Sequence, residues 1–264
     1  MLPQGNAELE LQRINPASLH TALFPARLTG QVMFSGNSTA QQATLALTDG
    51  TRHLEAKLDH RGDTLNFSRL LLAQGRAELA ANGSVQLRSP HQWRIAGTLQ
   101  HFDPAAFVDR LPRADLNADF SAAGQIVPQL GGHLNFQLDA SRLLGQTLAG
   151  KGELRFSGVN QLDDLIAANG KAWVRGTLDL ALSESRLNAQ GGWGSPAETL
   201  QFTLNAPDLA RHQTLLPGLG GTLTLAATLN GFPARPDVRL NARASRLTLP
   251  DWGHIGGLDT TALL

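Results

Sequence analysis

The sequence predicts an all-β fold, a mostly antiparallel sheet with a few short helical turns. Apolar and polar residues alternate at every second position from end to end, which gives each strand one apolar and one polar face. Turn signals rich in glycine interrupt this alternation. Only four short segments have a helical pattern. These three observations agree on the same fold class.

The segment "GTLTLAATLNG" (221–231) shows the strand pattern, because Leu223, Leu225 and Leu229 alternate with threonine, alanine and asparagine. Leucine is a weak strand former by propensity, but propensity in sheets is largely a packing effect, so the periodicity decides. We expect more than a dozen strands of roughly five to nine residues each. The expected turns are "DG" (49–50), "RGD" (61–63), "NG" (82–83), "GG" (131–132), "GGWGSP" (191–196) and "NGFPARP" (230–236).

The four helical segments are short. Asn15 is an expected N-cap before Pro16 in "NPASLHTALF" (15–24), and Asp103 takes the same place in "DPAAFVDRL" (103–111). The third segment, "APDLARHQTLL" (206–216), has only an alanine before its proline, and the fourth is "NQLDDLIAA" (160–168).

Three stretches repeat one order: strand, proline-started turn, "LP" or "FP", then an alternating strand that ends on glycine. They are 11–36, 99–124 and 204–231. The first two align without a gap, with their prolines 104 − 16 = 88 residues apart, and the next interval is 207 − 104 = 103. The sequence therefore predicts a single elongated array over 1–264, with approximate repeat units 1–90, 91–195 and 196–264.

Composition excludes several classes of function. The 22 basic and 22 acidic residues give a net charge of +0 without a basic stripe, which argues against nucleic-acid binding. There is no cysteine, and the eight histidines lack metal-binding spacing, so we expect most of them in solvated positions and expect no metal. No group of residues has a catalytic pattern, so we also expect no cofactor and no enzyme activity. The start "MLPQGNAELE" is not a signal peptide, and no apolar run could span a membrane. Strand pattern begins almost at the first residue and breaks off at "DTTALL", so we expect a fragment of a longer protein.

The apolar side of such a sheet must be covered by another layer, a membrane or a ligand. Four short helical turns are too small to cover a dozen strands. One alternative is a sheet that packs on itself as a β-sandwich or closed solenoid. A closed, dry passenger such as a β-helix is another, although its coils would repeat at shorter intervals than 88 and 103 residues. The third alternative is a groove that holds a ligand.

Four segments carry a resemblance to a known family: "LTGQVMFSGN" (28–37), "GTLDLALS" (176–183), "GGWGSPAETLQFTLNAPDL" (191–209) and "LLPGLGGTLTLAATLNGFPARPDVRLNARASRL" (215–247). They resemble the AsmA-like proteins of the bridge-like lipid transfer superfamily and, among these, the TamB family of the translocation and assembly module of Gram-negative bacteria. The resemblance implies an elongated, curved, U-shaped sheet with a hydrophobic groove, the β-taco. It also implies a periplasmic location, a parent protein anchored in the inner membrane and reaching the outer membrane, and a TamA-like outer-membrane barrel as partner.

Two functions follow from this resemblance. One is movement of phospholipids between the two membranes, with acyl chains in the groove. The other is assistance in the assembly of outer-membrane β-barrels or autotransporters, by strand addition at the sheet edge. The expected groove-lining residues, selected by their position in the alternation, are Phe34, Leu45, Leu47, Leu58, Leu116, Phe120, Leu134, Phe136, Leu138, Leu154, Phe156, Leu178, Leu180, Leu182, Leu200, Phe202, Leu204, Leu223, Leu225, Leu229, Val238 and Leu240.

Overall fold

The structure, a computed structural model, describes residues 5–18, 26–106, 111–159, 173–194, 197–232, 235–250 and 253–263. Within these ranges the chain forms sixteen β-strands and three short 3-10 helices, which confirms the predicted all-β fold. The chain divides into two compact units, residues 1–128 and 129–264.

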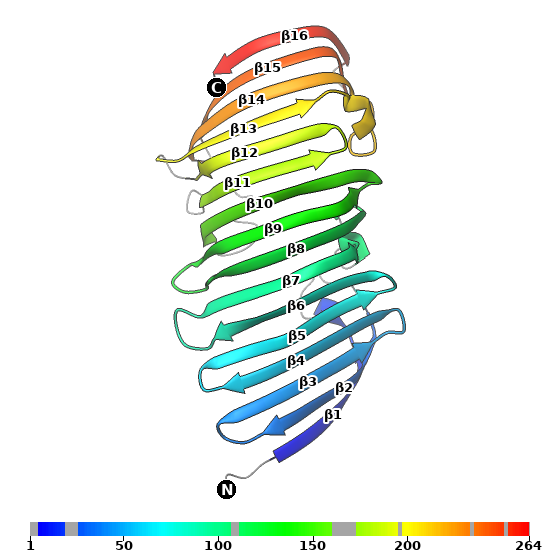
Figure 1. Cartoon of the computed structure of the whole chain (residues 1–264), viewed down its shortest axis with the longest axis vertical. Helices are drawn as coiled ribbons and strands as arrows, with labels where there is room; N and C mark the ends of the chain where they lie inside the picture. The colour runs from blue at the N-terminus through cyan, green and yellow to red at the C-terminus, as the bar shows by residue number, and fades with distance from the viewer. Residues whose placement is uncertain are drawn as a thin grey trace. The chain divides into compact units, whose positions relative to one another are not determined.

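The first unit is an open antiparallel sheet of eight strands (Figure 1). Each strand pairs with the next strand along the chain, because short hairpins connect most of them. The elements are β1 (Gly5–Ile14), η1 (Pro16–Ser18), β2 (Leu28–Gly36), β3 (Ala40–Thr48), β4 (Arg52–Arg61), β5 (Thr64–Gln74), β6 (Ala77–Gln86), β7 (Gln92–Phe102), η2 (Pro104–Ala106) and β8 (Ala114–Gln125).

The second unit is an open antiparallel sheet of the same kind, also with its strands in chain order. In Figure 1 its strands β14 to β16 curve along their length. The elements are β9 (Leu130–Leu143), β10 (Gln146–Val159), β11 (Trp173–Leu182), β12 (Ser185–Trp193), β13 (Thr199–Ala206), η4 (Leu209–His212), β14 (Gly220–Phe232), β15 (Arg235–Leu249) and β16 (Gly253–Leu263). Since each sheet is open, the alternative of a sheet packed on itself does not hold for either unit taken alone.

Most strands are longer than the expected five to nine residues, up to 15 in β15, while β2, β3, β12 and β13 have 8 or 9. Bulges account for part of the difference, since they let pairing continue past an irregular residue. Ala140 in β9 (φ 46°) and Arg246 in β15 (φ 49°) lie at such shifts of register. Bulges also bend the strands that contain them.

Two predicted turns are wrong. "NG" at 82–83 lies inside β6, and "GG" at 131–132 lies inside β9. The reason is their partners across the sheet: Gly83 pairs with Phe67, and Gly132 pairs with Phe156. A Cβ atom on Gly83 would collide with the ring of Phe67. Glycine is therefore present there for packing, not for a turn.

The proline turn after β1 begins at the predicted cap. Asn15 Oδ1 accepts hydrogen bonds from the backbone N–H of Ala17 (3.2 Å) and of Ala26 (3.3 Å). Arg13, two residues before the cap, has a φ of 56° at a bulge of β1.

The turn after β7 repeats this geometry 88 residues later. Asp103 Oδ1 accepts hydrogen bonds from the backbone N–H of Ala105 and of Ala114, both at 3.1 Å. His101, like Arg13, has a positive φ (47°) at a bulge. The gapless alignment in the sequence therefore corresponds to matching hydrogen bonds, while the three repeat units themselves stay a prediction.

The third turn, after β13, differs from the prediction in its cap. Asp208, rather than the alanine before Pro207, caps η4, and its Oδ1 accepts from the N–H of Ala210 at 3.1 Å. The fourth predicted helical segment, 160–168, lies outside the described residues.

Candidate functional site

The register aligns apolar residues in rows that cross the strands of the first unit. We call the side of each sheet that carries these rows the apolar face, and the opposite side the polar face. One row of the first unit is Leu11, Gly30, Leu47, Leu54, Leu72, Leu79, Leu99 and Ala118. The next row is Leu9, Val32, Leu45, Ala56, Leu70, Ala81, Gly97 and Phe120, and a third is Ala7, Phe34, Ala43, Leu58, Phe67, Gly83, Ile95 and Ala122.

The second unit has rows of the same kind. One is Leu134, Leu154, Gly176, Gly191, Leu200, Leu229 and Val238. The next is Phe136, Gly152, Leu178, Ala189, Phe202, Ala227, Leu240 and Ala262, and a third is Leu138, Gly150, Leu180, Leu187, Leu204, Leu225 and Ala242. Because side chains opposite each other in adjacent strands are in contact range, each row is a continuous apolar strip.

The groove-lining residues expected from the sequence all lie on the apolar face of their unit. Six belong to the first unit: Phe34, Leu45, Leu47, Leu58, Leu116 and Phe120. Sixteen belong to the second: Leu134, Phe136, Leu138, Leu154, Phe156, Leu178, Leu180, Leu182, Leu200, Phe202, Leu204, Leu223, Leu225, Leu229, Val238 and Leu240.

These side chains are half-buried, which separates the apolar face from an ordinary protein core. Of the expected residues only Leu47 is buried (5% exposed), while Phe34 is 43% exposed and the other twenty are in between. Each half-buried side chain therefore keeps part of its surface accessible. An open apolar surface of this extent is typical of a binding site.

The polar face has the opposite character. Along β13 the half-buried Leu200, Phe202 and Leu204 alternate with exposed threonine, glutamine and asparagine. Charged residues of the polar face pair with each other across strands. Hydrogen bonding to His53 and the positive charge of Arg69 lower the pKa of Glu55 on β4, whose carboxylate oxygens lie 2.8 Å from His53 Nε2 and 3.0 Å from Arg69 Nε.

One part of the apolar face in the second unit is covered. Leu209 of η4 (5% exposed) packs against Ala206, Ala244 and Leu247, which are also buried. The covered area lies at one end of β13 to β16, where Leu219, Leu223, Leu249, Ile255 and Leu258 surround it. The segment that contains η4 therefore covers the apolar face at the strand ends, beside the other apolar rows of the second unit.

A buried polar network holds η4 in this position, and the sequence did not reveal it. His212 is 7% exposed, which overturns the expectation of a solvated position for this histidine. Its Nδ1 donates to Gln146 Oε1 (2.8 Å), because an amide oxygen can only accept, and its Nε2 then accepts from the Ser185 hydroxyl (2.7 Å). Gln146 lies 66 residues before His212, so no local sequence signal could have indicated the contact.

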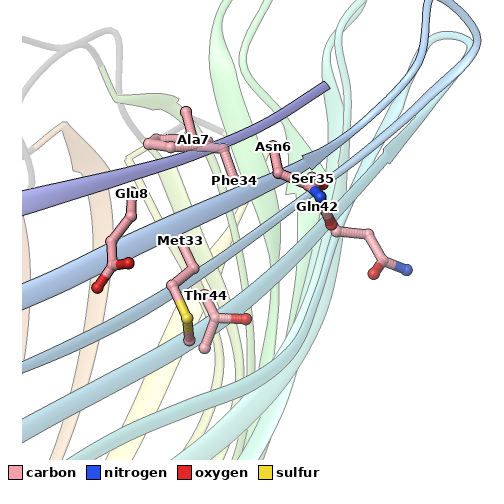
Figure 2. A pocket seen from close by; sticks show the side chains of 8 residues that line it. All are labelled: Asn6, Ala7, Glu8, Met33, Phe34, Ser35, Gln42 and Thr44. Carbon is pink, nitrogen blue, oxygen red and sulfur yellow. The ribbon is translucent and has the colours of Figure 1, made fainter. Parts of the chain in front are cut away.

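A shallow hollow lies at the β1 edge of the first unit, on the polar face (Figure 2). Figure 2 shows Glu8, Met33 and Thr44 on one side of the strands and Phe34 on the other. The hollow has a volume of about 560 Å³ and is wide open to solvent. With Glu8 as its only charged lining residue, it has no arrangement suited to acid–base or nucleophilic chemistry.

Within the described ranges, histidine, aspartate and glutamate form no group that could hold a metal ion. In the same part of the chain, no helix has the length and hydrophobicity needed to cross a membrane.

The comparison with protein families gives one match. The model of the family described as "TamB, N-terminal domain" matches residues 49–262, which includes most of the strands of both units. No curated protein and no solved structure matches the chain. Because the match extends over far more than half of the sequence, the chain belongs to the TamB family.

Proposed function

We propose that the apolar face is a path for phospholipid acyl chains between the inner and outer membranes of a Gram-negative cell. The protein would act in the periplasm as part of the translocation and assembly module, as a transport component rather than an enzyme. The observation that supports this proposal is the set of continuous apolar rows without a charged residue, in which most of the leucine and phenylalanine side chains are only half-buried.

The energetics favour such a path. Exposing an acyl chain to water costs about 0.8 kcal/mol per CH₂ group, so a sixteen-carbon chain costs roughly 12 kcal/mol. A surface of leucine, phenylalanine, valine and alanine side chains removes much of this cost wherever the chain contacts it. Because the rows run from strand to strand without a charged residue, a lipid acyl chain that moves along them meets no large energy barrier within a unit.

A charge on the apolar face tests the proposal. Leu180→Arg places a cation in the middle of a row, where an acyl chain would have to displace its water. The matched control is Asp179→Arg, which adds the same side chain at the adjacent, exposed position of the polar face. We expect Leu180→Arg to abolish most phospholipid transport by the full-length protein in cells and Asp179→Arg to leave it intact. Normal transport by a stably folded Leu180→Arg protein would refute the proposal.

A second function, assistance in outer-membrane protein assembly, has its own supporting observation. Among the described strands, β1 pairs only with β2, and most of its residues are exposed. The unpaired N–H and C=O groups of such an edge can add a strand from a client or from a TamA-like outer-membrane barrel. Under this alternative the inner-membrane anchor and the partner would position the edge, and the apolar face would serve folding alone.

A further inference from the structure

Six phenylalanines of the apolar face lie opposite a glycine or alanine of a neighbouring strand, whereas Phe102, at the end of β7, lies opposite Leu116. The pairs are Phe34–Ala43, Phe67–Gly83, Phe120–Gly97, Phe136–Gly152, Phe156–Gly132 and Phe202–Ala227. Larger partners such as leucine occupy many other positions of the same rows. The pairing of these six rings with a small residue is therefore a feature of both units.

The ring of Phe136 shows what the small partner does. A Cβ atom on Gly152 would lie 2.5 Å from Cε1 and 2.8 Å from Cζ of this ring. The outer edge of the ring therefore lies directly over Gly152, so that the ring lies flat on the neighbouring strand instead of standing upright. The ring therefore occupies the space over Gly152 that a larger side chain at this position would fill. Aromatic side chains that cover a strand glycine in this way are a known packing device of sheets.

We propose that Gly152 is a positioning residue for lipid passage, because it gives the Phe136 ring the room to lie flat and so keeps the apolar face open at this point. This inference rests on the proposed lipid function and adds a residue to it. An upright ring would project into the space that an acyl chain occupies. The same reasoning applies to Gly97, where a Cβ atom would lie 2.9 Å from Phe120 Cζ.

Gly152 is the position at which this can be tested without disrupting the sheet. The three atoms nearest to an added Cβ are all in side chains, two in Phe136 and one in Leu178 (Cδ1, 3.1 Å). At Gly97, in contrast, the nearest atom is the backbone carbonyl oxygen of Ala80. Gly152→Ala can therefore be accommodated by rotation of side chains, whereas Gly97→Ala would displace the backbone.

The experiment measures phospholipid crosslinking in cells, in the full-length protein with a photoreactive residue at Leu180. Gly152→Ala should reduce the lipid adducts severalfold, and a second substitution, Phe136→Leu, should restore them. Each Gly152→Ala protein is compared with its own parent, so the Phe136→Leu protein is the reference for the double variant. The control Gly256→Ala, where an added Cβ has no atom within 4 Å, should leave the adducts unchanged. Protein abundance and protease resistance report folding in each variant.

The outcomes separate this inference from the function on which it rests. Absence of lipid adducts in the protein without substitutions would refute the lipid function itself. If adducts form there but Gly152→Ala does not reduce them, or Phe136→Leu does not restore them, the positioning role is wrong. An equal loss of adducts when Gly152→Ala is introduced into the Phe136→Leu protein would also overturn it, since the glycine would then matter without the ring. Phe136→Trp gives a test that does not depend on the folding of Gly152→Ala: the larger ring exceeds the room over Gly152, so undiminished adducts in a folded Phe136→Trp protein would contradict the positioning role.

Discussion

At the scale of single residues, the local pattern predicts which face a side chain occupies but not what lies across from it. Alternation along one strand is sufficient to assign Leu180 or Phe202 to a face. The partner of Phe67, in contrast, is Gly83, which the sequence presents as half of a turn signal. Cross-strand pairs depend on the register of two strands, and the register depends on hairpin length and bulges, which a single segment does not encode.

Asp49, in the hairpin between β3 and β4, gives a pH prediction at this scale. Burial raises its pKa, but hydrogen bonds from the backbone N–H of Arg52 and Thr51 outweigh burial and lower the pKa from 3.8 to about 2. A folded-state pKa below the unfolded value adds stability above pH 3.8, and this stability is lost as the pH falls toward 2.

We therefore expect Asp49→Ala to destabilise this hairpin by about 1 kcal/mol at neutral pH and by much less near pH 2. Amide hydrogen exchange of residues 48–53, compared between the two proteins across this range, measures the difference. An effect of Asp49→Ala that is the same at both ends of the range would show that the carboxylate charge is not responsible.

At the scale of elements, the sequence predicts the caps of two proline turns correctly, but it does not predict how the third turn packs against the sheet. The caps at Asn15 and Asp103 are confirmed, with matching hydrogen bonds. The turn that contains η4 has a shifted cap, and its docking through His212 joins residues that are 66 positions apart. Local capping chemistry is readable from the sequence, whereas docking depends on the completed sheet.

The η4 turn gives the prediction at this scale. Leu209→Ala removes a side chain that is 5% exposed, and we expect it to cost about 3 kcal/mol and to release η4 from the end of β13 to β16. Leu215→Ala in the same loop is the matched control, because Leu215 is 43% exposed and should cost little. Limited proteolysis at residues 207–219 reports the release. Equal protease resistance of the two variants would contradict the role of Leu209 as the anchor of this loop.

At the scale of the whole chain, the all-β fold and the membership of the TamB family agree with what the pattern and the resemblance predict. The sequence could not decide between an open sheet and one packed on itself, because alternation only requires that the apolar face be covered by something. Each unit is an open sheet with half-buried apolar rows. Under the proposed function, a lipid acyl chain covers this surface.

The most direct measurement is photocrosslinking in cells at adjacent positions on the two faces of the second unit. Probes at Leu138, Leu180 and Leu225 report the apolar face, and probes at Gln137, Asp179 and Thr224, all exposed, report the polar face of the same strands. We expect phospholipid adducts at the first three positions and none at the other three. Adducts to outer-membrane proteins, with no lipid at the apolar positions, would contradict the lipid path and support the assembly function instead.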